Sequence, residues 1–308
     1  MKTERTIELT KCAFCSKESA LRLSHIIPRF VWDWLKRSSA TGYIRGGDSI
    51  DRRRQDGYKE RLLCENCEQL FSAWEKQVAE KVFLPLHTGE YLPAQPIEYG
   101  DWMSKFAASV CWRVLFLYKE LGLSHFSESL ATMADTALVN WHSYLTGSST
   151  DPGSNELHCV PLGPIDSSTM PNAPPNLNRY LLRTVDMDVA CNPVSAFVYV
   201  KMCRLMVFGF IHMPDRQSWQ GSQVSVNEGS FSNRKIVLPR PIGTFISDRA
   251  VNTHSIALQL SKNQRNKLDQ WIQDNPDLVA ASESFRAMKH DVEVFGDDAF
   301  ARDQEQKQ

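Results

Sequence analysis

The sequence lacks any segment typical of a protein that enters or crosses a membrane. Its first residues, MKTERTIELTK, contain no apolar stretch, so we expect no signal peptide. No run approaches the roughly 18 consecutive apolar residues of a membrane-spanning helix. The longest apolar run, near Leu205–Met213, has the length of a strand. We therefore expect a cytoplasmic protein that has no membrane partner.

The chain also lacks an excess of charge of either sign. Its 308 residues carry a formal net charge of -1, so there is no overall positive field to attract a polyanion. Any surface for nucleic acid must therefore be local. With 42% hydrophobic and 23% charged residues, the composition is that of a folded protein with one large domain or two ordinary ones.

Several common catalytic signatures are missing as well. The sequence has no G-x-S-x-G motif, no P-loop, no Rossmann glycine pattern and no internal repeat. His212, His254 and His290 have no spacing that indicates a site. Candidates for chemistry must therefore come from the N-terminal part of the chain.

The eight cysteines fall into two groups. Four are scattered among apolar neighbours and have the pattern of small buried hydrophobic residues without a functional role: Cys111, Cys159, Cys191 and Cys203. The other four form two C-x-x-C pairs, Cys12 with Cys15 and Cys64 with Cys67.

Two such pairs can present four thiolates to one tetrahedral Zn²⁺. A disulfide is the first alternative, which a reducing cytosol disfavours, and a thioredoxin-like redox site is the second, which needs only one C-x-x-C. The segment between the pairs, Ser16–Leu63, is longer than in a compact zinc ribbon, so it must contain structure of its own. We predict one structural zinc ion.

The motifs in this segment follow a recognisable order. Leu21–Phe30 reads LRLSHIIPRF, and the second cysteine pair lies in LLCENCE at the start of an amphipathic helix. The order C-x-x-C, SHIIP, LLCENCE and helix resembles the HNH (ββα-metal) endonuclease family built on a treble-clef zinc scaffold. The resemblance covers about Lys11–Phe83.

The segments SHIIPRFVWDWLK, DGYKERLLC and CEQLFSAWEK are also similar to uncharacterised bacterial proteins described as HNH endonucleases. Several of those proteins are encoded near phage-defence genes. The resemblance thus implies hydrolysis of phosphodiester bonds, of DNA rather than RNA, in phage defence.

The resemblance also implies roles for individual residues. His25 matches the general base of the family, a role that suits a neutral imidazole near pH 7. The family holds a divalent metal at three further positions, which are occupied here by Ser24, Lys59 and Ser72. A catalytic Mg²⁺ or Mn²⁺ would therefore need other ligands. For His25 itself the alternative is a buried histidine satisfied by a backbone carbonyl.

Three acids could replace the missing ligands. Glu68 directly follows the last cysteine of the pair, Glu75 shares its helix face, and Asp56 precedes the second strand. Alternatively, Glu68 interacts with the free amides at the helix N-terminus and Glu75 is a solvated charge. We take His25, Glu68 and Lys59 as the catalytic candidates, with Lys59 able to neutralise a phosphate without a metal.

Arginines gather between the histidine motif and the second strand. Residues 30–39 predict a short helix, and residues 41–60, TGYIRGGDSIDRRRQDGYKE, a Gly-rich basic loop beside His25. We predict that this loop and the strand after it bind phosphates through Arg45, Arg52, Arg53, Arg54 and Arg61. The alternative is a solvated loop, because Asp48, Asp51 and Asp56 dilute its positive charge.

Beyond Phe83 the resemblance gives little guidance. Prolines and glycines in residues 85–100 indicate a linker, and helices are predicted over Trp102–Leu121 and Ser127–Leu145. We predict strands within residues 157–162, 179–190, 195–213, 223–226 and 234–246, and helices from about Asp248. The predicted fold is therefore α+β: a treble-clef zinc HNH-like domain over residues 1–84, then a mixed helical and β domain over residues 101–308.

Two functions are compatible with these observations. The first is an HNH-like nuclease in which His25 is the base and atypical ligands hold a metal. The second is a zinc-binding module that keeps the scaffold, has lost the chemistry, and binds nucleic acid or protein. The second half would then serve sensing, oligomerisation or the binding of a defence-system partner.

Overall fold

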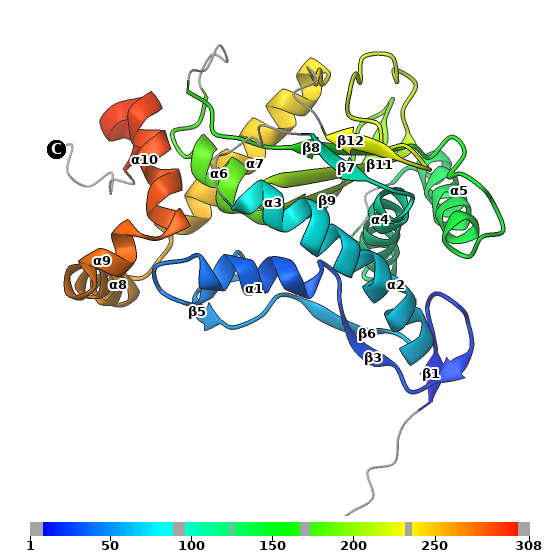
Figure 1. Cartoon of the computed structure of the whole chain (residues 1–308), viewed down its shortest axis with the longest axis horizontal. Helices are drawn as coiled ribbons and strands as arrows, with labels where there is room; N and C mark the ends of the chain where they lie inside the picture. Colours follow the sequence, from blue (N-terminus) through cyan, green and yellow to red (C-terminus); the bar gives the residue numbers. More distant parts are fainter. Residues whose placement is uncertain (1–8, 89–95, 124–125, 167–172, 232–235, 301–308) are drawn as a thin grey trace, which may run out of the picture.

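The computed structural model describes residues 9–88, 96–123, 126–166, 173–231 and 236–300 (Figure 1). The fold is α+β, as predicted. The strands are β1 (Thr10–Lys11), β2 (Glu18–Ser19), β3 (Arg22–His25), β4 (Ile44–Gly46), β5 (Ser49–Arg54), β6 (Lys59–Leu63), β7 (Ile97–Tyr99), β8 (Leu157–Pro161), β9 (Val185–Cys191), β10 (Ala196–Met202), β11 (Leu205–His212) and β12 (Gly229–Phe231). The α-helices are α1 (Arg29–Arg37), α2 (Glu65–Val78), α3 (Leu84–His87), α4 (Trp102–Glu120), α5 (Glu128–Leu145), α6 (Leu177–Arg183), α7 (Arg240–Leu258), α8 (Lys262–Asp274), α9 (Pro276–Ala280) and α10 (Glu283–Phe295). A π-helical turn, Ala79–Phe83, joins α2 to α3, and a 3-10 turn, Gly296–Ala299, follows α10.

An antiparallel sheet in the order β8-β11-β10-β9 forms the centre of the second half. One face shares a core with α4 and α5, to which β10 contributes Val198 and Val200. The other face packs against α6 and α7, to which β10 contributes Phe197 and Tyr199. Because both faces are buried, β10 and β11 are almost continuously apolar instead of alternating.

The N-terminal segment consists of small β pairs around α2. Strands β1 and β2 form a hairpin, β4 and β5 form another, and β3 pairs with β6 so that His25 lies opposite Lys59. Helix α2 then packs along α4. Phe14 contacts both helices, with ring centroids 5.0 Å from Phe71 of α2 and 5.2 Å from Trp112 of α4. The N-terminal segment and the second half therefore share one hydrophobic core.

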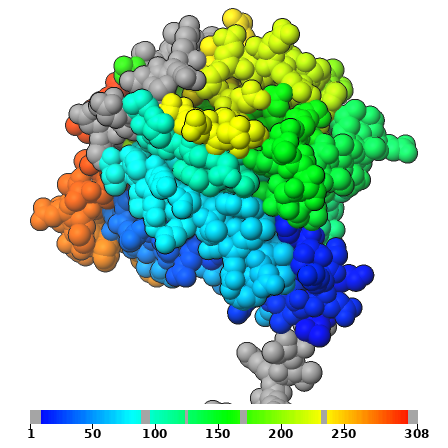
Figure 2. All heavy atoms as spheres, turned by 45° about the vertical axis from the view of Figure 1, so that its right-hand side comes forward, coloured from blue at the N-terminus to red at the C-terminus, as the bar shows by residue number. Residues whose placement is uncertain are grey.

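The C-terminal helices return to the N-terminal segment. In α8, the indole Nε1 of Trp271 donates to the carbonyl of Ala40 at 3.2 Å. The amide of Ser261, at the start of α8, donates to Asp51 Oδ1 of β5 at 2.9 Å. In the space-filling view, these helices border the blue N-terminal residues (Figure 2). Helix α8 thus contacts the β4–β5 hairpin and the loop that precedes it.

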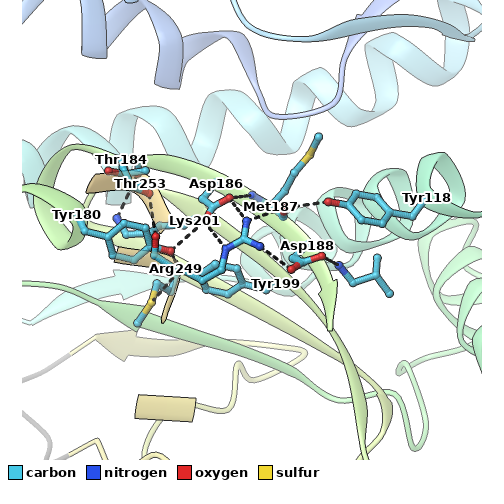
Figure 3. A network of polar contacts seen from close by, with 12 residues as sticks. Tyr118, Tyr180, Thr184, Asp186, Met187, Asp188, Tyr199, Lys201, Arg249 and Thr253 are labelled. Carbon is cyan, nitrogen blue, oxygen red and sulfur yellow. Dashed lines mark hydrogen bonds and ion pairs between the residues drawn. The ribbon is translucent and has the colours of Figure 1, made fainter. Parts of the chain in front are cut away.

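A polar network fixes α7 against the edge of the sheet (Figure 3). Arg249 of α7 donates through Nε to Asp186 Oδ2 at 2.8 Å and through one terminal nitrogen to Asp188 Oδ2 at 2.6 Å. The Tyr180 hydroxyl donates to the same Asp186 oxygen at 2.9 Å and lies 3.0 Å from that of Tyr199. Both carboxylates are therefore compensated, and the network joins α7 to α6 and to the β9 edge of the sheet.

Several elements differ from the sequence-based prediction. The strand predicted over residues 179–190 is the end of α6 followed by β9, and the strand predicted over residues 234–246 is wrong from Arg240 on, where α7 begins. Residues 223–226 form only a single bridge between Gln223 and His158. Cys191 is exposed instead of buried.

The boundaries of the predicted linker contain regular structure. Within residues 85–100, the end of α3 and the whole of β7 are ordered elements, and β7 pairs with β12. Residues 89–95 of the predicted linker lie outside the described part of the chain. The predicted basic loop is the β4–β5 hairpin, and the predicted helices over residues 102–121 and 127–145 are α4 and α5.

At Gly209, β11 approaches helices α4 and α5 closely. A Cβ at this position would lie 2.8 Å from Cys111 Sγ and 2.8 Å from a ring carbon of Trp141.

We expect Gly209→Ala to lower the free energy of unfolding by about 1–3 kcal/mol, because the core must shift to accept a methyl group. Gly243→Ala in α7 is the matched control, since nothing lies within 4 Å of its Cβ position. The control should be neutral or stabilising by up to about 1 kcal/mol in denaturant unfolding. Equal midpoints for both variants would contradict the close packing at Gly209.

Candidate zinc site and histidine site

The first cysteine pair lies in a tight turn between β1 and β2. The amide of Cys12 donates to the carbonyl of Lys17 at 2.9 Å, and the amide of Ser16 donates to the carbonyl of Cys12 at 2.8 Å. Ser16 adopts a left-handed conformation with φ 60°, which reverses the chain directly after Cys15. Both thiols are therefore presented from the same short loop.

The second pair lies at the N-terminus of α2, where Cys64 is the N-cap residue and Cys67 is in the first turn. The four sulfur atoms lie within 4.8 Å of one another, and Cys15 Sγ is 3.7 Å from Cys64 Sγ. A tetrahedral zinc site with Zn–S bonds of about 2.3 Å has sulfur–sulfur edges of about 3.8 Å. The predicted cysteines therefore lie together and fit one zinc ion.

The pKa shifts of these thiols also favour a bound cation. Burial, reinforced by the neighbouring thiols, raises the pKa of Cys67, whereas for Cys64 hydrogen bonds outweigh burial and lower the pKa to about 7. The pKa values of Cys64 and Cys67 are therefore shifted in opposite directions. A bound cation stabilises all four thiolates at once, which is the chemistry that Zn²⁺ supplies.

His25 lies at the end of β3, and its closest side-chain partner is Asp56. His25 Nε2 is 2.8 Å from Asp56 Oδ1, and the other oxygen of Asp56 is paired with Lys59. Burial alone would raise the pKa of Asp56, but hydrogen bonds from Lys59, His25 and the Gly57 amide together lower it to about 2. Asp56 is therefore an ionised acceptor that orients the imidazole, and no backbone carbonyl of the described residues does so.

The Asp56–Gly57 turn is fixed by Trp32 of α1. A Cβ on Gly57 would lie 2.0 Å from a ring carbon of Trp32, so only glycine fits beneath the indole. The indole Nε1 donates to the carbonyl of Ile27 at 3.0 Å. The helix that follows the SHIIP motif thus sets the position of the carboxylate that holds His25.

Glu68 does not join this group. Its Oε2 accepts a hydrogen bond from Ser24 Oγ at 2.6 Å, and Ser24 is fully buried. Neighbouring residues of a strand point to opposite faces, so Ser24 and His25 face opposite sides of β3. The structure thus brings His25 together with Lys59 and Asp56, and brings Glu68 together with Ser24.

Glu75 is not a solvated charge. It forms an ion pair with Arg113 of α4 at 2.7 Å, and Arg113 is only 2% exposed. The same guanidinium donates to the backbone carbonyl of His25 at 2.9 Å. Sequence reasoning missed Arg113, although an arginine inside the apolar run VCWRVLF signals a buried charge that needs partners.

The donors near His25 do not fit a divalent cation well. Among the described residues, the four cysteines are the one group of three or more His, Cys, Asp or Glu side chains close enough to hold a metal ion. Mg²⁺ and Mn²⁺ favour several oxygen ligands, and the Asp56 carboxylate is already occupied by three donors. The residues around His25 therefore do not form a site for such an ion.

The predicted phosphate-binding arginines differ in how free they are. Arg52 is exposed and Arg53 lies over the ring of Tyr43 at 4.6 Å. Arg54 is paired with Asp48, and Arg45 donates to the carbonyl of Ile50 at 2.6 Å. Arg61, on β6, donates to the carbonyl of Leu21 at 3.0 Å. Among the described residues, Arg52 and Arg53 are therefore the two arginines of β5 without a carboxylate partner.

No protein family model, curated protein or solved structure matches this chain significantly. The resemblance to HNH nucleases thus depends on the sequence motifs alone. No helix within the described ranges has both the length and the apolar character that a membrane span requires.

The cysteine cluster predicts one tightly bound zinc ion per chain. Cys64→Ser should lose the zinc and unfold the N-terminal segment, because the ion links the β1–β2 turn to the start of α2. Cys191→Ser is the matched control, since this exposed cysteine lies outside the cluster. Elemental analysis and thermal unfolding of the three proteins measure both effects. Wild-type protein without zinc, or a Cys64→Ser protein as stable as the control, would contradict the site.

Proposed function

We propose that this chain hydrolyses phosphodiester bonds of nucleic acid, with His25 as the general base. The observation that supports this most directly is the 2.8 Å contact between His25 Nε2 and Asp56 Oδ1, beside Lys59 on the same carboxylate. A histidine oriented by an acid and placed next to a cation is a common arrangement for activating water.

The order of elements supports an HNH-like, treble-clef assignment. A cysteine turn is followed by β3 with its histidine, by β6, by a second cysteine pair and by α2. In the proposal, zinc is structural and holds this unit together, and it takes no part in the reaction. The motif resemblance favours DNA over RNA as substrate and a role in phage defence.

The proposed chemistry uses residues that are already in place. If Asp56 accepts the Nε2 proton, Nδ1 of His25 is the basic nitrogen. Nδ1 takes a proton from a water molecule as its oxygen attacks phosphorus, and Lys59 stabilises the charge that develops on the phosphoryl oxygens. The bond from phosphorus to the leaving oxygen then breaks, and that oxygen takes a proton from solvent. The side chain of His25 is 14% exposed, so water can reach it.

A binding module without catalysis is the second candidate. It is favoured by the contact between Glu68 and Ser24, which uses the acid that could have replaced the missing metal ligand. In that case the β4–β5 hairpin would bind nucleic acid or a partner protein, and the histidine pair would only stabilise the turn.

The catalytic proposal predicts separable effects for three substitutions. His25→Ala should slow cleavage by about 10²–10⁴-fold, the usual contribution of a general base. Asp56→Asn should also slow it, because the imidazole loses its ionised acceptor. Glu68→Gln should cut nearly as fast as wild type, because glutamine can still accept the Ser24 hydrogen bond. Cleavage of DNA and RNA, single- and double-stranded, with Mg²⁺ or Mn²⁺ added, measures these rates.

Zinc content and thermal unfolding of each variant show whether the fold is intact. Equal cleavage by all variants would place the activity outside this site. A complete lack of cleavage by wild type, with nucleic-acid binding retained, would favour the binding module.

The exposed arginines of β5 predict a defined change in salt dependence. Replacing Arg52 and Arg53 by Gln should lower the slope of log K against log salt by about 1.8 for duplex DNA, because each phosphate contact contributes about 0.9. The control replaces Arg286 and Lys289 of α10, which removes the same charge from another part of the surface. Binding titrations from low to moderate salt give the slopes. If the two double variants have the same slope, the hairpin does not contact phosphates.

A further inference from the structure

A groove lies between the β4–β5 hairpin and the C-terminal helices. It has a volume of about 590 Å³, within the range of small-molecule sites in proteins. Its walls come from α1, β4, α6, α8, α9 and α10, and most of the lining is apolar, including Ile44, Leu268, Ile272 and Met288.

Two guanidinium groups interrupt the apolar lining. Arg45 donates to the carbonyl of Ile50 at 2.6 Å and to Gln264 Oε1 at 3.1 Å. Arg183 donates to the carbonyl of Leu35, at the end of α1, at 3.0 Å and lies over the Trp34 ring at 4.7 Å. Throughout the described ranges, no carboxylate lies within ion-pair distance of either group. Their hydrogen-bond partners are neutral, so two positive charges in this groove have no counter-ion.

The nearest acids are engaged elsewhere. Asp51, whose pKa the charge of Arg45 helps to lower, accepts a hydrogen bond from the amide of Ser261 at 2.9 Å. Glu283, the acid whose charge acts on Arg183, forms an ion pair with Arg286 at 2.8 Å. Burial lowers the pKa of Arg183, as expected for a charge in surroundings that do not compensate it. An anion in the groove would supply the negative charge that Arg45 and Arg183 lack.

We propose that this groove binds a free organic anion, a phosphate or carboxylate carried on an apolar body. The anionic group would lie between Arg45 and Arg183, and the apolar body would cover the aliphatic side chains of α8 and α10. Because charge-assisted hydrogen bonds are the strong ones, the arginines supply most of the specificity, and the apolar walls supply most of the buried area. The ligand would also join the hairpin to the C-terminal helices, since both line the groove.

In the test, octyl phosphate is titrated into the full chain, and isothermal titration calorimetry measures its binding. We expect saturable binding of one molecule per chain. Arg45→Gln should weaken the affinity about tenfold or more, the effect of losing a charged hydrogen bond. Met288→Trp should abolish binding by filling the groove. Lys289→Gln, which removes an exposed cation of α10 that does not line the groove, should bind as wild type does. Unchanged zinc content and thermal unfolding show that each variant is folded.

Two matched probes separate charge from apolar burial. Octyltrimethylammonium has the same chain and the opposite charge, and inorganic phosphate has the charge alone; neither should bind measurably. Equal binding of the cationic probe, or binding of octyl phosphate that neither Arg45→Gln nor Met288→Trp weakens, would overturn the proposal. The proposal would also be overturned if the molecular mass of the protein in solution rose with its concentration and Met288→Trp abolished this rise. A second copy of the chain would then cover the groove.

Discussion

Arg113 connects the parts of this molecule that matter most for its proposed chemistry. Its guanidinium is 2% exposed, forms an ion pair with Glu75 of α2 at 2.7 Å, and donates to the carbonyl of His25 at 2.9 Å. A charge taken out of water is tolerated only when it is paired and hydrogen-bonded, so α4, α2 and β3 must adopt their positions together. The backbone of the candidate base is thus held by a helix of the second half.

The zinc site and the hydrophobic core fix the N-terminal segment in complementary ways. The cysteines fix the ends of the segment, since the ion would join the β1–β2 turn to the first turn of α2. Phe14, inside the first cysteine pair, packs against Phe71 of α2 and Trp112 of α4, so the core continues from the N-terminal segment into α4. Small β pairs of two to six residues would have little stability alone, and both devices compensate for this.

The parts of the structure that sequence predicted are those set by local spacing. Two C-x-x-C pairs correctly predicted the cysteine cluster, and helical periodicity correctly predicted α4 and α5. The strand predicted over residues 234–246 was wrong from Arg240 on, because Pro241, Gly243 and β-branched neighbours have poor helix propensity. There, burial of Ile242, Ile246 and Ala250 on one helical face outweighs the propensity.

The partners of the site residues could not be predicted in the same way. Asp56 was named only as a possible metal ligand, and its role beside His25 depends on a turn fixed by Trp32 and Gly57. Arg113 is 88 positions from His25, a separation that no local pattern covers. Likewise, the division of the arginines into paired and free groups depends on which side chains the hairpin brings together.

The return of the C-terminal helices to the β4–β5 hairpin has a consequence for how the protein is made. The contacts from Ser261 to Asp51 and from Trp271 to Ala40 join residues 210 and 231 positions apart. Synthesis at roughly 5–20 residues per second supplies both zinc-binding pairs many seconds before α8 leaves the ribosome. The cysteines can therefore bind their metal early, whereas the hairpin and its arginines gain their contacts only after α8 has been synthesised. A polypeptide released too soon would carry a completed zinc cluster and an unsupported basic hairpin.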